Sequence, residues 1–133
     1  MQVDHVGIVV RDLEAAIPCY RDRLGMVLVG QEEQPQAGVR AAYFDAGTAR
    51  IQLLQPTASG PIAGFLAEHG EGLHHICLLV DDIRAAVAAL APDAEVAIGI
   101  GGFGRRTCFL PVTISGLRVE LAERSPLEVG ASA

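Results

Sequence analysis

The sequence predicts an α+β fold of two βαβββ modules, in which mixed, curved sheets lie inside and helices outside. Three observations predict it. Residues 5–17 and 75–87 repeat one pattern, with five of thirteen aligned positions identical. Each repeat begins with the apolar alternation of a strand and continues with apolar residues at helical spacing. Turn-forming residues then separate three further strand candidates in each repeat.

The first module spans about residues 1–56. A helix is expected near 12–24, with Asp12 as its N-cap and Gly25 as its stop. Pro18 lies inside this helix and removes a hydrogen bond, so we expect a kink or a late helix start there. The strand candidates of this module lie at about 2–10, 26–33, 39–45 and 49–55.

The second module spans about residues 72–124, and a linker helix at about 61–69 is expected to join the two. In the second module, strands are predicted at 72–80, 94–99, 105–110 and 116–123, and a helix is predicted at 82–91. The glycine-dense segment 99–104 lies between two strands, so it predicts a loop over a pocket and not a dinucleotide-binding turn. Residues 125–133 are expected to form a frayed tail. Residues 1–133 together are the length of one domain.

Composition excludes several classes of function. The net charge of −6 argues against nucleic-acid binding, which needs a basic surface. No apolar run approaches the roughly 18–20 residues of a membrane span, and no signal peptide is visible at the start. Three cysteines are an odd number without paired spacing, which favours reduced thiols. We therefore expect a cytoplasmic protein that binds neither nucleic acid nor membrane.

Each repeat carries one polar residue early and another late, with matching apolar neighbours. The first repeat has His5 and Gln52, 47 positions apart, and the second has His75 and Glu120, 45 positions apart. Strand alternation places all four on the sheet faces opposite the bulky aliphatic residues. If the two sheets curl toward each other, these four side chains line one cavity.

A lone His at a strand start is usually a hydrogen-bonded structural residue, and a Gln or Glu in a strand usually faces outward. The recurrence at matching positions instead favours a shared site. An inward Glu120 also requires a charge partner, because burying an unpaired carboxylate is costly. Two imidazole nitrogens and two oxygen donors, with positions left open, suit a divalent Co, Mn, Ni or Zn ion.

These residues match the pattern of a known family. The chain resembles the vicinal oxygen chelate superfamily, whose domains pair βαβββ modules around a metal, and within it the methylmalonyl-CoA epimerases. The resemblance covers about residues 3–122. It rests on DHVGIVVRDLEAA (4–16), IQLLQP (51–56), PIAGFLAEHGEGLHHICLLVDDI (61–83) and VELAE (119–123). It implies that His5, Gln52, His75 and Glu120 are the metal ligands and that His74 points away.

The resemblance implies an isomerase acting on an acyl-CoA. The enzyme would remove the proton between a thioester and a carboxylate and return it to the other face. A metal chelated by both substrate oxygens would stabilise the enolate. Glu120 is then the implied ligand and acid/base, and a homodimer is implied because homodimers are usual for the fold.

One departure from the family concerns the second acid/base. Some bacterial epimerases carry a second catalytic Glu where this chain has Ala41. The remaining candidates are Glu32, Glu33 and Asp45, each of which also fits an ordinary surface position.

A second departure is the segment 109–113, which reads FLPVT where the family usually shows FLHPK. Arg105 and Arg106 lie nearby, where a family Lys commonly sits, and are candidates for binding the substrate's phosphates. A solvated surface pair explains them equally well. Tyr43 shares the face of Ala41 and is a further candidate for lining the substrate pocket, although core packing is an equal alternative.

Two alternatives stay open. The chain could be another metal-dependent enzyme of the superfamily, such as a glyoxalase-like isomerase or a biosynthetic enzyme. It could also be a metal-free protein that sequesters a small molecule, in which the four polar residues only decorate a cavity.

Overall fold

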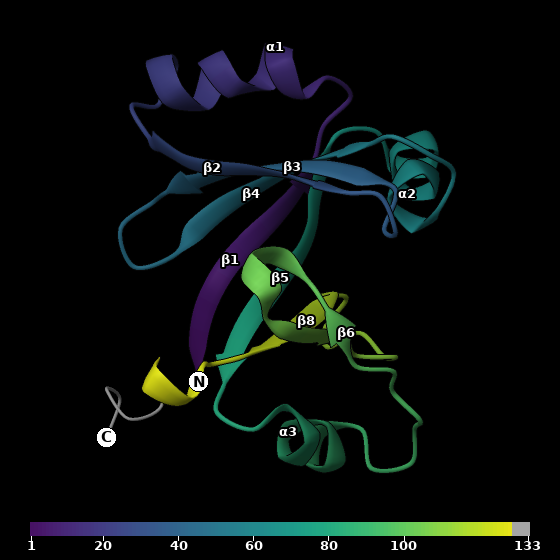
Figure 1. The fold of residues 1–133 in the computed structure, drawn as a ribbon. Helices are drawn as coiled ribbons and strands as arrows, with labels where there is room; N and C mark the ends of the chain where they lie inside the picture. The colour runs from purple at the N-terminus through teal and green to yellow at the C-terminus, as the bar shows by residue number, and fades with distance from the viewer. Residues whose placement is uncertain (129–133) are drawn as a thin grey trace. The chain divides into compact units, whose positions relative to one another are not determined.

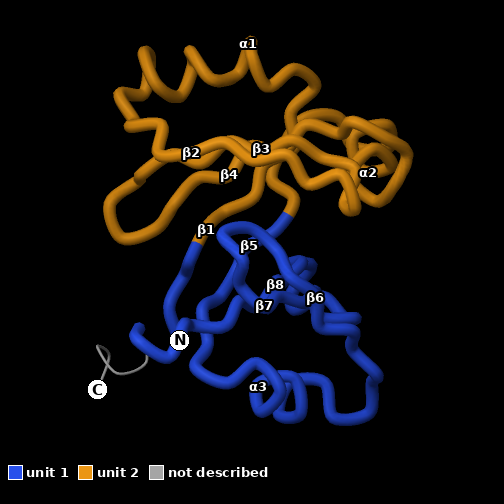
Figure 2. Tube along the Cα trace, in the orientation of Figure 1, with its two compact units in different colours: residues 1–4, 75–133 blue, residues 5–74 orange. Residues whose placement is uncertain are grey.

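A computed structural model describes residues 1–128, and it divides the chain into two compact units. Unit 2 is His5–His74, and unit 1 joins Met1–Asp4 to the chain from His75 onward (Figure 2). Two strands therefore pass from one unit into the other, namely β1 (Gln2–Val9) and β5 (Gly72–Val80). That the whole chain forms a single domain stays a prediction. Among the described residues, no helix is long and apolar enough to cross a bilayer.

In unit 2 the strands follow the order β2-β3-β4-β1, with β1 parallel to β4 and the other pairs antiparallel. The remaining strands of this unit are β2 (Val27–Gln34), β3 (Val39–Asp45) and β4 (Arg50–Pro56). Helix α1 (Leu13–Pro18) runs along one face of these strands (Figure 1). Helix α2 (Pro61–His69) packs on the other. The predicted bounds of β3 and α2 are confirmed.

Two apolar layers hold unit 2 together, one on each face of its sheet. Under α1, the buried side chains are Val10, Leu13, Ile17, Ala42, Phe44 and Leu53. On the opposite face, Phe65 and Leu66 of α2 pack against Val39, Tyr43 and Leu54. The predicted alternation is therefore confirmed, because neighbouring strand residues enter different layers.

Helix α1 shows how the sequence sets its own boundaries. The Asp12 carboxylate accepts a hydrogen bond from the backbone N–H of Ala15 at 3.3 Å, as an N-cap does. At Pro18, which has no N–H to donate, the helix changes to a π-helical turn, η1 (Cys19–Arg23). Gly25 then adopts a φ of 72°, which ends the helix as predicted.

Unit 1 repeats this plan with the strand order β5-β8-β7-β6. Its other strands are β6 (Gly99–Ile100), β7 (Arg106–Phe109) and β8 (Val119–Glu123), with a 3₁₀ turn, η2 (Gly102–Gly104), between β6 and β7. Helix α3 (Ile83–Leu90) covers one face, where Val80, Ile83, Val119 and Leu121 are buried. Asp82 caps α3 through the N–H of Ala85 at 3.1 Å, so the repeat extends to its helix cap.

Two expectations for unit 1 need correction. The strand predicted at 94–99 is wrong except at its end, because only Gly99 and Ile100 pair with β7. Val96 and Ile98 create the alternation, but they satisfy it by packing against the layer under α3 and not by joining a ladder. The expected frayed tail begins with a helical turn at 126–128, and residues 129–133 lie outside the described part of the chain.

Candidate metal site in two halves

Unit 2 contributes the first two predicted ligands from neighbouring strands. His5 of β1 and Gln52 of β4 are 7% and 6% exposed. Gln52 is the register partner of Gly7, which lies two residues from His5 on the same face of β1. The structure therefore places His5 and Gln52 on one face of the unit 2 sheet, as predicted. This face is the one opposite α1.

The amide of Gln52 has a defined orientation. Its Nε2 donates to the hydroxyl oxygen of Tyr43 at 3.2 Å, and the same oxygen accepts from Nε2 of Gln34 at 3.4 Å. The other end of the amide, Oε1, is buried and has no hydrogen-bond partner. An unsatisfied buried acceptor costs about 1–3 kcal/mol. A cation at Oε1 would remove this cost, so the residue fits the predicted role of an oxygen ligand.

Unit 1 contributes the other two ligands, which are in contact. Nε2 of His75 lies 3.2 Å from Oε1 of Glu120, with the two side chains 2% and 13% exposed. β5 and β8 pair in parallel with Cys77 opposite Glu120, so His75, Cys77 and Glu120 share one face. A carboxylate that is only 13% exposed to water is stabilised by a nearby cation, so Glu120 suits a metal ligand. The ring of Phe109 meets the His75 imidazole edge-to-face, with 5.1 Å between centroids.

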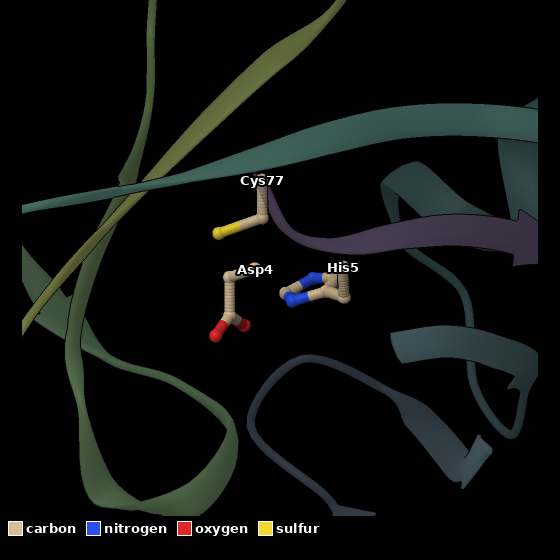
Figure 3. A group of neighbouring side chains, drawn as sticks. All are labelled: Asp4, His5 and Cys77. Carbon is tan, nitrogen blue, oxygen red and sulfur yellow. The ribbon is translucent and has the colours of Figure 1, made fainter. Parts of the chain in front are cut away.

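Cys77 and Asp4 lie beside this pair. The Asp4 carboxylate lies within 4.8 Å of the Cys77 sulfur (Figure 3), and His5, drawn with them, belongs to unit 2. Burial raises the pKa of the Cys77 thiol, and the negative charges of Glu120 and Asp4 raise it further. The thiol therefore stays protonated, and its hydrogen bond to Glu120 adds a donor to that carboxylate.

The other predicted site residues have partners inside their own units. Arg105 makes a bidentate contact with Glu128, at 2.6 and 2.9 Å, and Arg106 lies 3.3 Å from a Glu123 oxygen. Tyr43 is 1% exposed and holds Gln52. The roles of Arg105, Arg106 and Tyr43 in binding substrate stay predictions.

His74 and Ala41 lie in the apolar surroundings of α2. The His74 ring meets Phe65 edge-to-face, with 4.9 Å between centroids, and strand alternation points it away from His75. Ala41 is completely buried in the layer under α2. Glu32 is its register partner across β2 and β3, so Glu32 lies on the Gln52 face. Glu33 instead pairs with Arg40 at 3.8 Å, and Asp45 is exposed and accepts from the N–H of Gly47.

Sequence reasoning missed a second repeated pair, Gln55 and Glu123. Oε1 of Gln55 accepts from the N–H of Leu13 at 2.7 Å, and Oε2 of Glu123 accepts from the N–H of Ile83 at 2.9 Å. Each therefore ties the end of a ligand-bearing strand to the first residue of a helix. The signal was present in the sequence, because Gln55 and Glu123 each follow the late predicted ligand by three residues.

Unit 2 also has a hollow of about 460 Å³, which lies away from His5 and Gln52. Its walls come from β1, α1, η1 and the start of β5, and include Ile8, Ala16 and Tyr20. Ile8 and Ala16 pack with the α1 layer, which is the face opposite His5 and Gln52. The hollow is therefore separate from the predicted ligands of this unit.

Comparisons with known proteins identify the family of this chain. The model of the glyoxalase/bleomycin resistance protein/dioxygenase superfamily matches residues 4–109. The ethylmalonyl-CoA/methylmalonyl-CoA epimerase of Cereibacter sphaeroides is 38% identical over 130 residues, which cover 92% of this chain and 97% of that relative.

Solved structures give the same result. The methylmalonyl-CoA epimerase of Mycobacterium tuberculosis superposes with a TM-score of 0.85 at 34% identity, covering 97% of this chain and 91% of that one. A methylmalonyl-CoA epimerase in complex with methylmalonyl-CoA and ammonium superposes with a TM-score of 0.84 at 31% identity, covering 94% and 95% of the two chains. This chain therefore belongs to the glyoxalase/bleomycin resistance protein/dioxygenase superfamily.

Proposed function

We propose that this chain is a metal-dependent epimerase that interconverts the two epimers of methylmalonyl-CoA. The observation that carries the proposal is the relation to an ethylmalonyl-CoA/methylmalonyl-CoA epimerase at 38% identity over nearly the full length of both proteins. Relatives of this kind support the proposed substrate and activity. The side chains of this chain itself support the proposed metal ion.

The proposed ligands are His5, Gln52, His75 and Glu120, two from each repeat. Three features of the separate units support them. His5 and Gln52 share a face, His75 and Glu120 are in contact, and Gln52 Oε1 is buried without a partner. Two nitrogens and two oxygens suit Co, Mn, Ni or Zn. When bound, such a cation supplies Lewis-acid stabilisation of negative charge that develops on the substrate's oxygens.

Glu120 is the proposed acid/base. Epimerisation requires that the proton on the carbon between the thioester and the carboxylate is removed and later returned to the opposite face. A carboxylate is competent for the transfer on the face that it occupies when it lies within hydrogen-bond reach of the carbon's proton, and the transfer on the opposite face needs a second proton donor or acceptor. Glu120 is partly shielded from water, and the thiol of Cys77 donates to it. The His75 imidazole, 3.2 Å away, restricts the orientation of the carboxylate.

Exchange of the substrate's α-proton with heavy water tests the proposal. The metal-loaded protein should catalyse exchange into methylmalonyl-CoA, and Glu120→Gln should slow it by about 10²–10⁴-fold. Glu95→Gln is the matched control, because Glu95 is an exposed carboxylate of the same unit. A wild-type protein that retains a divalent ion but exchanges no proton would favour another metal-dependent enzyme of the superfamily. A protein that retains no ion would favour the metal-free binding protein.

The name of the relative suggests a second substrate for the same assay, ethylmalonyl-CoA. The two thioesters differ by one methylene, which an apolar pocket discriminates by only about 10–200-fold. Comparing kcat/KM for the two thioesters therefore tells which acyl group the site favours.

A cytoplasmic homodimer is part of the same proposal. All three cysteines are free, and Cys77 and Cys108 are buried, which fits a reducing compartment. Light scattering after gel filtration should give twice the 14.0 kDa mass of the chain. A monomer at micromolar concentration would contradict the dimer.

A further inference from the structure

The two repeats differ in the residue that faces each late ligand across the sheet. In unit 2, Tyr43 of β3 is the register partner of Gln52. In unit 1, Phe109 of β7 is the register partner of Glu120. Both partners are aromatic, and they differ by one hydroxyl group. The half with a carboxamide ligand has the hydroxyl, and the half with a carboxylate ligand does not.

Hydrogen-bonding chemistry explains this pairing. A carboxamide carries two N–H donors and one oxygen, whereas an ionised carboxylate has oxygens alone. A buried Gln therefore needs an acceptor for its nitrogen, and the Tyr43 hydroxyl oxygen provides one at 3.2 Å. A buried Glu needs no acceptor, so a phenyl ring suffices beside it. The contacts of Glu120 agree, because the thiol of Cys77 donates to it and the His75 nitrogen lies beside it.

The hydroxyl of Tyr43 is itself fixed from a second side. Nε2 of Gln34 lies 3.4 Å from the Tyr43 oxygen and 3.2 Å from Oε2 of Glu32. Its two hydrogens can therefore serve the two acceptors, which orients the Gln34 amide. Two N–H groups then point at the Tyr43 oxygen. That oxygen is held as an acceptor for Gln52, and Gln52 Oε1 is left facing away from Tyr43, buried and without a partner.

We infer that Tyr43 is a positioning residue that keeps the carboxamide of Gln52 oriented with its oxygen available for the cation. This inference rests on the metal site proposed above. Without the hydroxyl, the two orientations of the amide would be similar in energy, and one of them turns an N–H toward the cation. The hydroxyl thereby allows a neutral ligand in one repeat, so the four donors carry a single negative charge from Glu120.

Divalent-metal affinity of four variants tests this inference: Tyr43→Phe, Gln52→Glu, the double variant that combines them, and Tyr20→Phe. Tyr43→Phe should weaken Co²⁺ or Zn²⁺ binding by about 10–100-fold, as is usual when an outer partner of a ligand is lost. The double variant Gln52→Glu with Tyr43→Phe should bind within about threefold of wild type, because a carboxylate presents oxygen in either orientation. Tyr20→Phe is the control, since Tyr20 packs against Phe44 in the α1 layer. It should leave the affinity unchanged.

The rescue separates positioning from a merely structural role. Both Tyr43→Phe and the double variant lack the hydroxyl, so a purely structural contribution of Tyr43 would leave both weak. Equal affinity of Tyr43→Phe and wild type overturns the inference while the proposed epimerase stands. Weak binding by the double variant, when Gln52→Glu alone binds tightly, also overturns it. A wild-type chain that binds neither ion overturns the inference together with the proposed metal site.

Discussion

Glu123→Ala should destabilise the protein more than the equivalent change in the other repeat, Gln55→Ala. Both residues accept a hydrogen bond from the first backbone N–H of a helix, which has no partner within the helix itself. Gln55 is a neutral acceptor, so its loss should cost about 1 kcal/mol. Glu123 is charged, and its bond to the N–H of Ile83 should be worth about 1.5–3 kcal/mol. Because the two residues occupy equivalent positions in the two repeats, the comparison measures how much a negative charge at a helix N-terminus adds to the free energy of unfolding.

Two smaller effects add to the loss at Glu123. The helix dipole of α3 favours a negative charge at its N-terminus by about 0.3–1 kcal/mol. The partly exposed ion pair with Arg106, at 3.3 Å, adds less than about 1 kcal/mol. Glu123→Ala should therefore cost about 2–5 kcal/mol. For a chain of this length each kcal/mol lowers Tm by about 3–5 °C.

Urea and thermal unfolding followed by circular dichroism provide the measurement. Glu123→Gln keeps an acceptor but not the charge, so its cost should fall between those of wild type and Glu123→Ala. Added salt should narrow the gap between wild type and Glu123→Gln, because the charge that distinguishes these two proteins is screened. If Glu123→Ala costs no more than Gln55→Ala, the charge at α3 contributes nothing and the reasoning is refuted.

Three further predictions use other parts of the structure. Arg105 lowers the pKa of the Glu128 carboxyl from 4.5 to about 2, so this pair stabilises the protein at neutral pH. The stability difference between wild type and Glu128→Gln should vanish as pH falls from about 5 to about 2, and a constant difference would contradict the pairing. Leu53→Ala should cost about 2–5 kcal/mol in urea unfolding, because Leu53 is fully buried under α1; a cost below 1 would mean that the layer is loosely packed. Gly101→Ala would place its Cβ 2.7 Å from Oγ1 of Thr107, so it should cost about 1–3 kcal/mol. Combining it with Thr107→Ala should recover most of that loss, and an additive double variant would argue against the clash.

Elements were predicted best where glycine or proline residues mark the same boundaries as the spacing of the hydrophobic residues. Strand β3 and helix α2 have the predicted bounds, since glycine or proline flanks each of them. The segment 94–99 failed because alternation reports burial on one side and not pairing with a neighbour. Val96 and Ile98 obtain that burial from the layer under α3 without a ladder.

The candidate site was predictable as a list of residues but not as a set of contacts. Repetition identified His5, Gln52, His75 and Glu120 and the sheet faces that carry them. The contact of Tyr43 with Gln52 depends on the β3–β4 register, which places the two residues directly opposite each other. Alternation within one strand gives the face of a residue but not its partner on the next strand. Arg105 and Glu128 are 23 residues apart, and Glu128 lies in the segment expected to form a frayed tail.

The passage of β1 from unit 1 into unit 2 has a practical consequence for anyone who shortens or tags this protein. Met1–Asp4 directly precede unit 2 in the sequence, yet they belong to unit 1. Arg124 donates to the side-chain oxygen of Gln2 at 3.3 Å, so a residue of the second repeat contacts one of these four residues. Cutting the chain between the two sequence repeats would consequently leave neither fragment with all of its own structure.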